Sequence, residues 1–139
     1  MARSRTDVRV GETIGPVTMA VARDTLVAYA NASLDQNPIH QDEDFARGVG
    51  LPDVIAHGMW TMGAASSVVA EWAGDAGRVE QFRTRFTNMV VVPREGAEVE
   101  VSGVVKSVDD DGRATVEVSA TADGTKVLGR CTAVVRLDP

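Results

Sequence analysis

The stretch that decides the fold is HGMWTMGAASSVVAEW, which occupies residues 57–72. Its one charged side chain, Glu71, lies near its end, and small residues fill its middle. A helix that is apolar on every side is expected to be buried, and its small side chains would let a surrounding sheet approach it closely. Gly74 follows at a place where helices commonly end. The sequence therefore predicts a buried helix from His57 to about Trp72.

After this helix the hydrophobic pattern changes from a helical repeat to a repeat of two. Polar and apolar residues alternate over 98–102 and again over 115–120, which is typical of an antiparallel strand with one buried face. Asp109–Gly112 and Asp123–Gly124 are hairpin signals between such strands. Further strands are expected at 16–21, near 79–92 and near 127–137. Together they predict an α+β chain in which an antiparallel meander wraps around a long central helix, the hot-dog fold.

Ahead of the central helix the sequence indicates two short helical pieces joined by an ordered turn. The first is expected over Arg23–Ala32, and it must end before Pro38 because the residue before a proline is pushed out of the helical region. A short acidic helical turn is expected at Asp42–Ala46. No linker or repeat divides the chain, so residues 1–139 are expected to form one hot-dog domain with residues 1–10 as an exposed N-terminal arm.

Composition narrows the class of protein further. The chain has 139 residues, of which 44% are hydrophobic and 24% charged, as in soluble globular domains. A net charge of −6 argues against nucleic acid as a partner, and no apolar run approaches the roughly 20 residues that span a bilayer, which argues against a membrane. The absence of a secretory pattern and the single cysteine, Cys131, favour the cytoplasm. Cys131 itself is expected to be a small core residue of a strand.

Asp35 and His40 are the first candidates for chemistry, five residues apart across the turn Asp35-Gln36-Asn37-Pro38-Ile39-His40. An imidazole can take and give a proton near neutral pH. A carboxylate can orient a water molecule or hold the imidazole in one tautomer, and the Asn37 amide can anchor the loop or hold the water. The alternative is structural, because Asp-x-Asn-Pro is a common turn in which the carboxylate accepts backbone N–H groups.

His57 and Gly58 are the second candidates, because they open the central helix. The first N–H groups of a helix lack partners and carry partial positive charge, so the Gly58 N–H could stabilise charge that develops on a carbonyl oxygen. Alternatively, Gly58 only permits tight packing and His57 only anchors the loop. His40 and His57 could join Asp35 around a metal ion, but the two histidines are 17 positions apart and no close ligand spacing such as H-x-x-x-H is present, so no metal is expected.

The residues Ser33–His40 followed by Ala46 resemble the hydratase-2 motif, and Ala56-His57-Gly58-Met59 resembles the second block of the same family. The chain is similar over nearly its whole length to the MaoC-like (R)-specific enoyl-CoA hydratases, especially short actinobacterial dehydratases of fatty-acid and mycolic-acid elongation. The resemblance implies a catalytic dyad of Asp35 and His40, an oxyanion hole at Gly58 and positioning roles for Asn37 and His57. It also implies no metal or organic cofactor, and dimers with the thioester arm near the subunit interface.

The sequence departs from the family at Leu34, where relatives usually have glycine just before the motif aspartate. If that position requires a positive φ, leucine is strained there.

The expected function is reversible hydration of trans-2-enoyl thioesters to (3R)-3-hydroxyacyl thioesters, carried either by CoA or by an acyl-carrier protein. Such anionic substrates need local basic charge, for which the candidates are Arg83, Arg85, Arg94, Lys106 and Arg130. The chain is expected to be a homodimer, with a heterodimer with another hot-dog chain as the alternative. Alternative functions are a non-catalytic subunit that shapes the acyl tunnel of an active partner, a polyketide-pathway dehydratase acting on carrier-protein-bound substrate, and a hot-dog thioesterase. The last would need an acid on the central helix, where only Glu71 is available.

Overall fold

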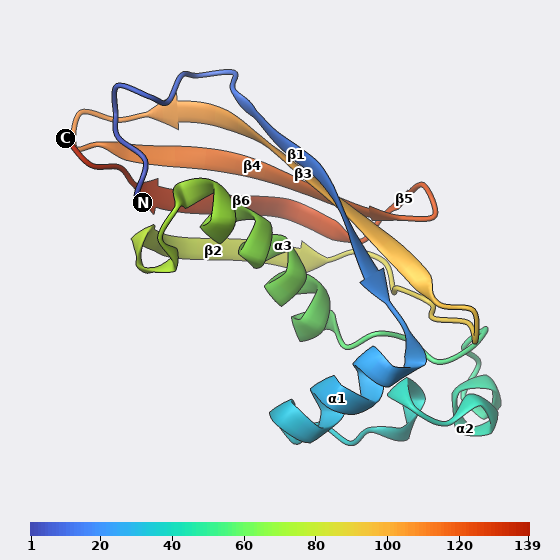
Figure 1. Cartoon of the computed structure of the whole chain (residues 1–139). Coiled ribbons are helices and arrows are strands. Elements are labelled where there is room, and N and C mark those ends of the chain that lie inside the picture. The colour runs from blue at the N-terminus through green and yellow to red at the C-terminus, as the bar shows by residue number, and fades with distance from the viewer.

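The computed structural model describes residues 1–139 and shows a curved antiparallel sheet wrapped around one helix (Figure 1). The central helix is α3, Gly58–Ala73. The other helices are α1 (Arg23–Ser33) and α2 (Glu43–Gly48), with short 3-10 turns η1 (Pro38–His40) and η2 (Ala76–Arg78). The strands are β1 (Thr13–Val21), β2 (Val79–Phe86), β3 (Ala97–Val108), β4 (Arg113–Ala122), β5 (Thr125–Lys126) and β6 (Leu128–Arg136). The predicted hot-dog fold is thus present, with the expected helix as its filling.

The order of the strands corrects the expected meander. The sheet runs β1-β3-β4-β6-β2, with β5 paired to β4. The strand β4 pairs with β3 on one side and with β6 and the short β5 on the other, while β1 and β2 occupy the two edges. The strand expected near 79–92 ends at Phe86, since residues 90–92 instead join the segment before α3: the Ala56 N–H donates to the Val90 carbonyl, and the Val92 N–H to the Val54 carbonyl. This second pairing positions the start of α3.

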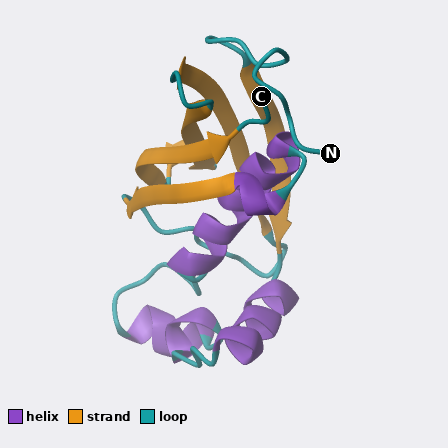
Figure 2. Ribbon diagram, turned by 90° about the vertical axis from the view of Figure 1, so that its left-hand side faces the viewer, coloured by secondary structure: helices purple, strands orange, loops and turns teal.

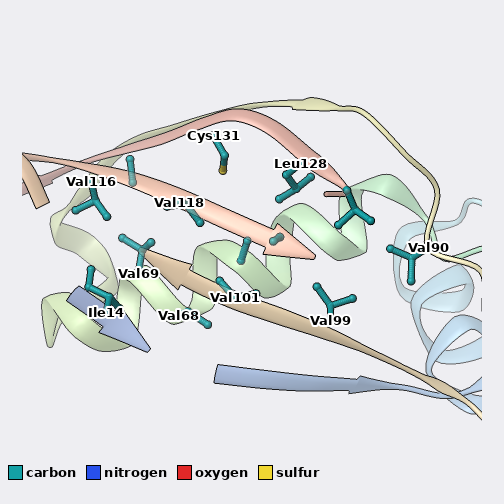
Figure 3. Close-up of a cluster of buried hydrophobic side chains, with 14 of the residues drawn as sticks. Ile14, Val68, Val69, Val90, Val99, Val101, Val116, Val118, Leu128 and Cys131 are labelled. Carbon is teal, nitrogen blue, oxygen red and sulfur yellow. The ribbon is translucent and has the colours of Figure 1, made fainter. Parts of the chain in front are cut away.

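The core lies between α3 and the concave face of the sheet (Figure 3). Alternate valines of β3 and β4, such as Val99, Val101, Val116 and Val118, point into it, as the repeat of two predicts. Cys131 on β6 is 2% exposed, which confirms its expected place. Burial raises the pKa of the Cys131 thiol, so it behaves as a small apolar side chain.

The helix α3 is not buried on every side, contrary to the prediction from its composition. Ala64, Ala65, Val68 and Val69 face the sheet and are buried. Residues at a spacing of four on the other side are exposed: Met59, Gly63, Ser67 and Glu71. The sheet of one chain covers only part of the helix circumference, so a strip of α3 that carries no charge before Glu71 remains uncovered.

The N-terminal arm is docked rather than loose. Most of residues 1–10 are exposed as expected, but Val8 is 7% exposed and belongs to the core. The Arg3 N–H donates to the Ala73 carbonyl, and Ser4 forms a parallel bridge with Asp138. Backbone hydrogen bonds along the C-terminal strand and the end of α3 therefore hold this arm, which is a correction to the simple exposed arm.

The helices α1 and α2 form a separate layer beyond the end of the sheet, near the start of α3 (Figure 2). The turn that carries Asp35 and His40 lies in this layer, and His57 and Gly58 open α3 beside it. No helix of the structure combines the length and the apolar character needed to span a membrane. The fold thus brings the two sequence motifs to one place.

Candidate active site

The turn between α1 and η1 is shaped by its own side chains. The α1 helix ends on Leu34, whose φ of 67° and ψ of 11° are left-handed. Asp35 Oδ1 then accepts the Asn37 N–H at 3.1 Å, and Asn37 Oδ1 accepts the Ile39 N–H at 3.2 Å. Pro38 begins η1, where its missing N–H costs nothing. These short-range hydrogen bonds restrict the backbone of the turn and so fix the position of His40 at the end of η1.

His40 is 7% exposed, and its ring is fixed by a backbone carbonyl. Its Nδ1 lies 2.6 Å from the Ile55 oxygen. A carbonyl oxygen can only accept, so Nδ1 carries the proton and, in the neutral ring, Nε2 has a free lone pair. The ring also stacks on that of His57, with centroids 3.7 Å apart and an angle of 22° between the planes. The Ile55 carbonyl could not be predicted from the sequence, because a backbone acceptor has no residue-type signature.

Burial is the main reason why the pKa of His40 lies below its usual value of 6.5. The Ile55 carbonyl raises the pKa, proximity to His57 lowers it, and the Asp35 carboxylate raises it, but burial outweighs the rest. His40 is therefore neutral at pH 7 and has the protonation state of a base.

His57 connects the start of α3 to the turn. It is 2% exposed, and its Nε2 donates to the Asp35 carbonyl oxygen at 3.0 Å. Its Nδ1 is buried with no hydrogen-bond partner. Tyr29 of α1 packs against its ring at a centroid distance of 4.7 Å. The anchoring role that the sequence left open for His57 is thus visible in these contacts.

Gly58 is the first residue of α3, and its N–H makes no hydrogen bond within the chain. A cavity of about 1050 Å³ adjoins it, lined also by His40, Thr61 and Phe86. A Cβ placed on Gly58 would lie 3.1 Å from the Phe86 ring. The free amide and His40 therefore share one cavity, and a side chain on residue 58 would crowd the Phe86 ring.

Asp35 and Asn37 lie at the edge of this arrangement. Both are exposed, and neither lines the cavity. One carboxylate oxygen of Asp35 nevertheless lies within 4.8 Å of a ring nitrogen of His40 and of one of His57. That spacing suits either a shared water molecule or a metal ion, although the Nδ1 of His40 is already committed to Ile55. The side-chain oxygen of Asn37 caps η1 by accepting the Ile39 N–H.

The basic residues expected to receive an anionic substrate are only partly available. Arg94 is bound to Glu43 at 2.7 Å, and Lys106 lies 3.9 Å from Glu117. Arg83, Arg85 and Arg130 make no ion pair; all three are exposed on the neighbouring strands β2 and β6. None of the five lines the cavity, whose charged wall residues are Glu98 and Asp123.

Comparison with known proteins places this chain in a family. Residues 6–126 match the family model described as the MaoC like domain. The chain is a MaoC-like domain. This confirms the resemblance inferred from the two sequence motifs, and the solved structures that it matches confirm the hot-dog fold.

One solved structure, titled "MaoC-like dehydratase", superposes on this MaoC-like domain with a TM-score of 0.96 and 40% identity, covering 99% of this chain and 43% of that chain. Another, titled as an (R)-hydratase from A. caviae involved in PHA biosynthesis, gives a TM-score of 0.83 and 25% identity, covering 94% of this chain and 97% of that one.

Curated relatives are mostly far longer. The fatty acid synthase beta subunit TOXC of Cochliobolus carbonum is 37% identical over 103 residues, which are 73% of this chain and 5% of that protein. A probable enoyl-CoA hydratase 2 of Dictyostelium discoideum is 37% identical over 84 residues, 59% of this chain and 28% of that protein. The chain thus spans about one twentieth of the first curated relatives it matches.

Proposed function

We propose that this MaoC-like domain adds water reversibly to trans-2-enoyl thioesters and forms (3R)-3-hydroxyacyl thioesters. The observation that carries the proposal is the neutral His40. Its Nδ1 proton is held by Ile55, while His40 and the free Gly58 amide line the same cavity. A base and an oxyanion donor in one cavity are what addition of water to a conjugated thioester requires.

The role of Gly58 follows from where charge develops. When the water oxygen bonds to C3, the double-bond electrons move toward the thioester oxygen, which becomes enolate-like. A hydrogen bond from the free Gly58 N–H stabilises that oxygen, and the partial positive charge at the start of α3 adds to the effect. Loss of one such donor typically lowers the rate about 10²–10³-fold.

Proton transfer falls to Asp35 and His40. One of the two groups accepts a proton from water as the water oxygen bonds to C3, and the other donates a proton to C2 as the enolate collapses. Transfer of one proton from the first group to the second then restores both for the next turnover. The Asp35 carboxylate lies within 4.8 Å of a ring nitrogen of His40, so that one water molecule can contact both groups. His57 and Asn37 hold this pair in place, His57 through the Asp35 carbonyl and Asn37 through η1.

The names of the relatives support the choice of substrate. They include an enoyl-CoA hydratase 2, an (R)-hydratase and fatty acid synthase beta subunits. All these names refer to acyl-chain chemistry, and the word (R)-hydratase supplies the proposed configuration at C3. CoA and carrier-protein thioesters both remain in the proposed substrate class.

The proposal is tested by hydration of crotonyl-CoA, with chiral analysis of the product. We expect Asp35→Asn and His40→Ala each to lower kcat by at least about 10²-fold, as loss of a general acid or base usually does. Asp44→Asn, the same chemical change at an exposed aspartate of α2, serves as the control and should retain wild-type turnover. Rates near wild type in both dyad variants would remove the dyad from the mechanism.

The same assay, performed on this chain alone, separates the proposal from the alternatives. A non-catalytic subunit would be inactive until an active partner is added. A thioesterase would release free thiol, but Glu71 lies 13 residues beyond Gly58, about 20 Å along the helix at 1.5 Å per residue. That distance excludes Glu71 as an acid for chemistry at the cavity.

A further inference from the structure

Arg23, the first residue of α1, joins three segments that are distant in the sequence. Its Nε donates to the Val92 carbonyl at 2.8 Å, its Nη1 to Glu43 Oε1 at 2.9 Å and its Nη2 to Asp53 Oδ1 at 2.9 Å. The side chain is only 25% exposed. A guanidinium has a planar, fixed arrangement of donors, so three acceptors in different directions hold it, and are held by it, in one geometry.

The acidic partners of Arg23 are themselves fixed. Arg94 binds both carboxylate oxygens of Glu43, at 2.7 and 2.9 Å. The hydrogen bonds from Arg94 and then Arg23 lower the pKa of Glu43 to about 2, so Glu43 stays ionised at any pH suitable for an assay. Asp53 Oδ1 also accepts the Val54 N–H at 2.8 Å. We call Arg23, Glu43, Asp53 and Arg94 the arginine clamp.

The clamp lies directly beside the segment that orients His40. This segment, residues 54–56, follows Asp53 and supplies the Ile55 carbonyl that binds His40 Nδ1. Its Val54 carbonyl accepts the Val92 N–H at 2.9 Å. Arg23 therefore holds both sides of this short pairing, one through Asp53 and the other through the Val92 carbonyl.

The same segment continues into the rest of the site. The Ile55 N–H donates to the Ile39 carbonyl at 3.2 Å, next to His40. Two residues further on, His57 and Gly58 open α3. A shift of residues 54–56 would thus move the acceptor of the His40 ring and the oxyanion donor relative to each other.

We propose that Arg23 is a positioning residue for the reaction, acting through Asp53 and Val92 to fix the Ile55 carbonyl and thereby the direction of His40 Nε2. The inference rests on the proposed function, since it assigns His40 a catalytic task. It adds a residue outside the sequence motifs, whose hydrogen-bond partners do not line the cavity.

A purely structural ion pair offers a matched comparison. Arg78 is also 25% exposed and binds Asp138 at 2.6 Å and Asp75 at 3.7 Å. It lies in η2, beyond the other end of α3. Replacement of either arginine removes an ion-paired guanidinium, but only replacement of Arg23 should disturb His40.

The experiment compares Arg23→Gln with Arg78→Gln by kcat, KM, Tm and the ¹⁵N chemical shifts of the His40 ring, which report its tautomer. We expect Arg23→Gln to lower kcat about tenfold or more with a small change in KM, because a misplacement of about 1 Å at a distance from the chemistry can cost 10²-fold. The Nδ1-protonated tautomer of His40 should lose population. Arg78→Gln should keep the wild-type kcat and tautomer even if its Tm falls equally.

Arg23→Lys gives a second measurement, which decides the matter if the Gln variant does not fold. Lysine keeps the charge near Glu43 and Asp53 but cannot serve three acceptors, so kcat should recover only in part. The proposal is overturned if Arg23→Gln or, should it not fold, Arg23→Lys leaves kcat and the His40 tautomer unchanged. It is equally overturned if Arg78→Gln lowers kcat as much.

The tautomer measurement keeps this inference separate from the proposed function. If the wild-type chain does not hydrate enoyl thioesters, the proposed function fails. The change in the His40 tautomer on replacement of Arg23 then still tests whether the clamp orients the ring.

Discussion

At the scale of single residues, the protonation of His40 is set by its position in the fold. The usual pKa of 6.5 would leave a quarter or so of the rings charged at pH 7, and a charged ring cannot act as a base. Burial lowers that pKa, with His57 contributing in the same direction. The enzyme proposed here therefore has its base ready at neutral pH.

The pH dependence of activity tests this. We expect the acid limb of kcat/KM for crotonyl-CoA to have its midpoint below 6.5, since this parameter reports the ionisation of the free enzyme. The ring shifts of His40, followed by NMR over the same pH range, should give the same midpoint. A midpoint above 6.5 in both measurements would contradict the lowered pKa.

The same pKa predicts the sign of a stability effect. The folded pKa of His40 is depressed, so below pH 6.5 the unfolded chain binds more protons than the folded one. The contribution of neutral His40 to the free energy of unfolding is therefore fully present above pH 6.5 and is lost as the pH falls through the lowered value. In chemical denaturation at several pH values, the free energy of unfolding should fall less steeply with decreasing pH in His40→Gln than in the wild type.

Leu34 is a second residue whose local conformation has a testable cost. Its φ of 67° is left-handed, and its side chain is 83% exposed, so no packing compensates for the strain. The left-handed conformation costs a non-glycine residue roughly 1–2 kcal/mol. Glycine avoids this strain, but it also raises the conformational entropy of the unfolded chain, which offsets part of the gain in stability. We expect Leu34→Gly to raise the free energy of unfolding by about 1 kcal/mol.

Urea denaturation of the two chains measures this difference, and crotonyl-CoA hydration provides the control, since the turn geometry should be unchanged. A decrease in stability on replacement would show that Leu34 is not strained.

At the scale of elements, the sequence predicted most of the helices and strands because they depend on local patterns. The alternating residues of β3 and β4 and the hairpin signals between them needed no tertiary information. The all-round burial expected for α3 was wrong, because the number of faces that a sheet covers depends on the whole fold. The length of β2 was overestimated for the same reason, since residues 90–92 found another partner.

Only those residues of the site that belong to the two sequence motifs could be predicted from the sequence. Asp35, His40 and Gly58 could be named because their residue types carry chemistry in a recognisable spacing. The Ile55 carbonyl, the stacking of His57 on His40 and the Arg23 contacts could not. They depend on segments that meet only after folding, and nothing in their residue types indicates where they lie.

The start of α3 gives a prediction at the scale of an element. In Gly58→Ala the N–H remains, but the new methyl group would lie 3.1–3.3 Å from the Phe86 ring, closer than nearly all real contacts. Either the ring or the helix start must shift, so we expect kcat/KM for crotonyl-CoA to fall about tenfold, as small displacements at a reacting centre do.

A second substitution distinguishes crowding from other effects. Phe86→Leu removes the ring atoms that the methyl group would meet. In the Phe86→Leu background, Gly58→Ala should therefore lower kcat/KM by a smaller factor than it does in the wild-type background. Equal losses in both backgrounds would show that crowding against Phe86 is not the cause.

At the scale of the whole molecule, charge and apolar surface are both unevenly distributed. Arg83, Arg85 and Arg130 lie close together without acidic partners although the chain has a net charge of −6. An anion, such as the phosphates of a thioester substrate, would complement the positive charge of these arginines. The uncovered strip of α3 is a second uneven feature of the surface, and it is better suited to contact with another chain than to binding a ligand.

The strip consists of Met59, Gly63 and Ser67, and α3 carries no charge before Glu71. A helix of this composition is stable in water only when more of its surface is covered. A second copy of the chain can cover it, because a two-fold axis beside α3 would bring the same strip of both copies together. We therefore expect a homodimer with the α3 helices at its interface.

Light scattering coupled to gel filtration measures the mass in solution. Nothing lies within 4 Å of a Cβ built on Gly63, so Gly63→Arg should fold as a single chain and yet place a large charge in the interface. We expect the wild type to have twice the mass of one chain and Gly63→Arg to have the mass of one. Ser107→Arg, at an exposed position of β3, is the control and should remain dimeric, whereas a dimeric Gly63→Arg would place the interface on another face.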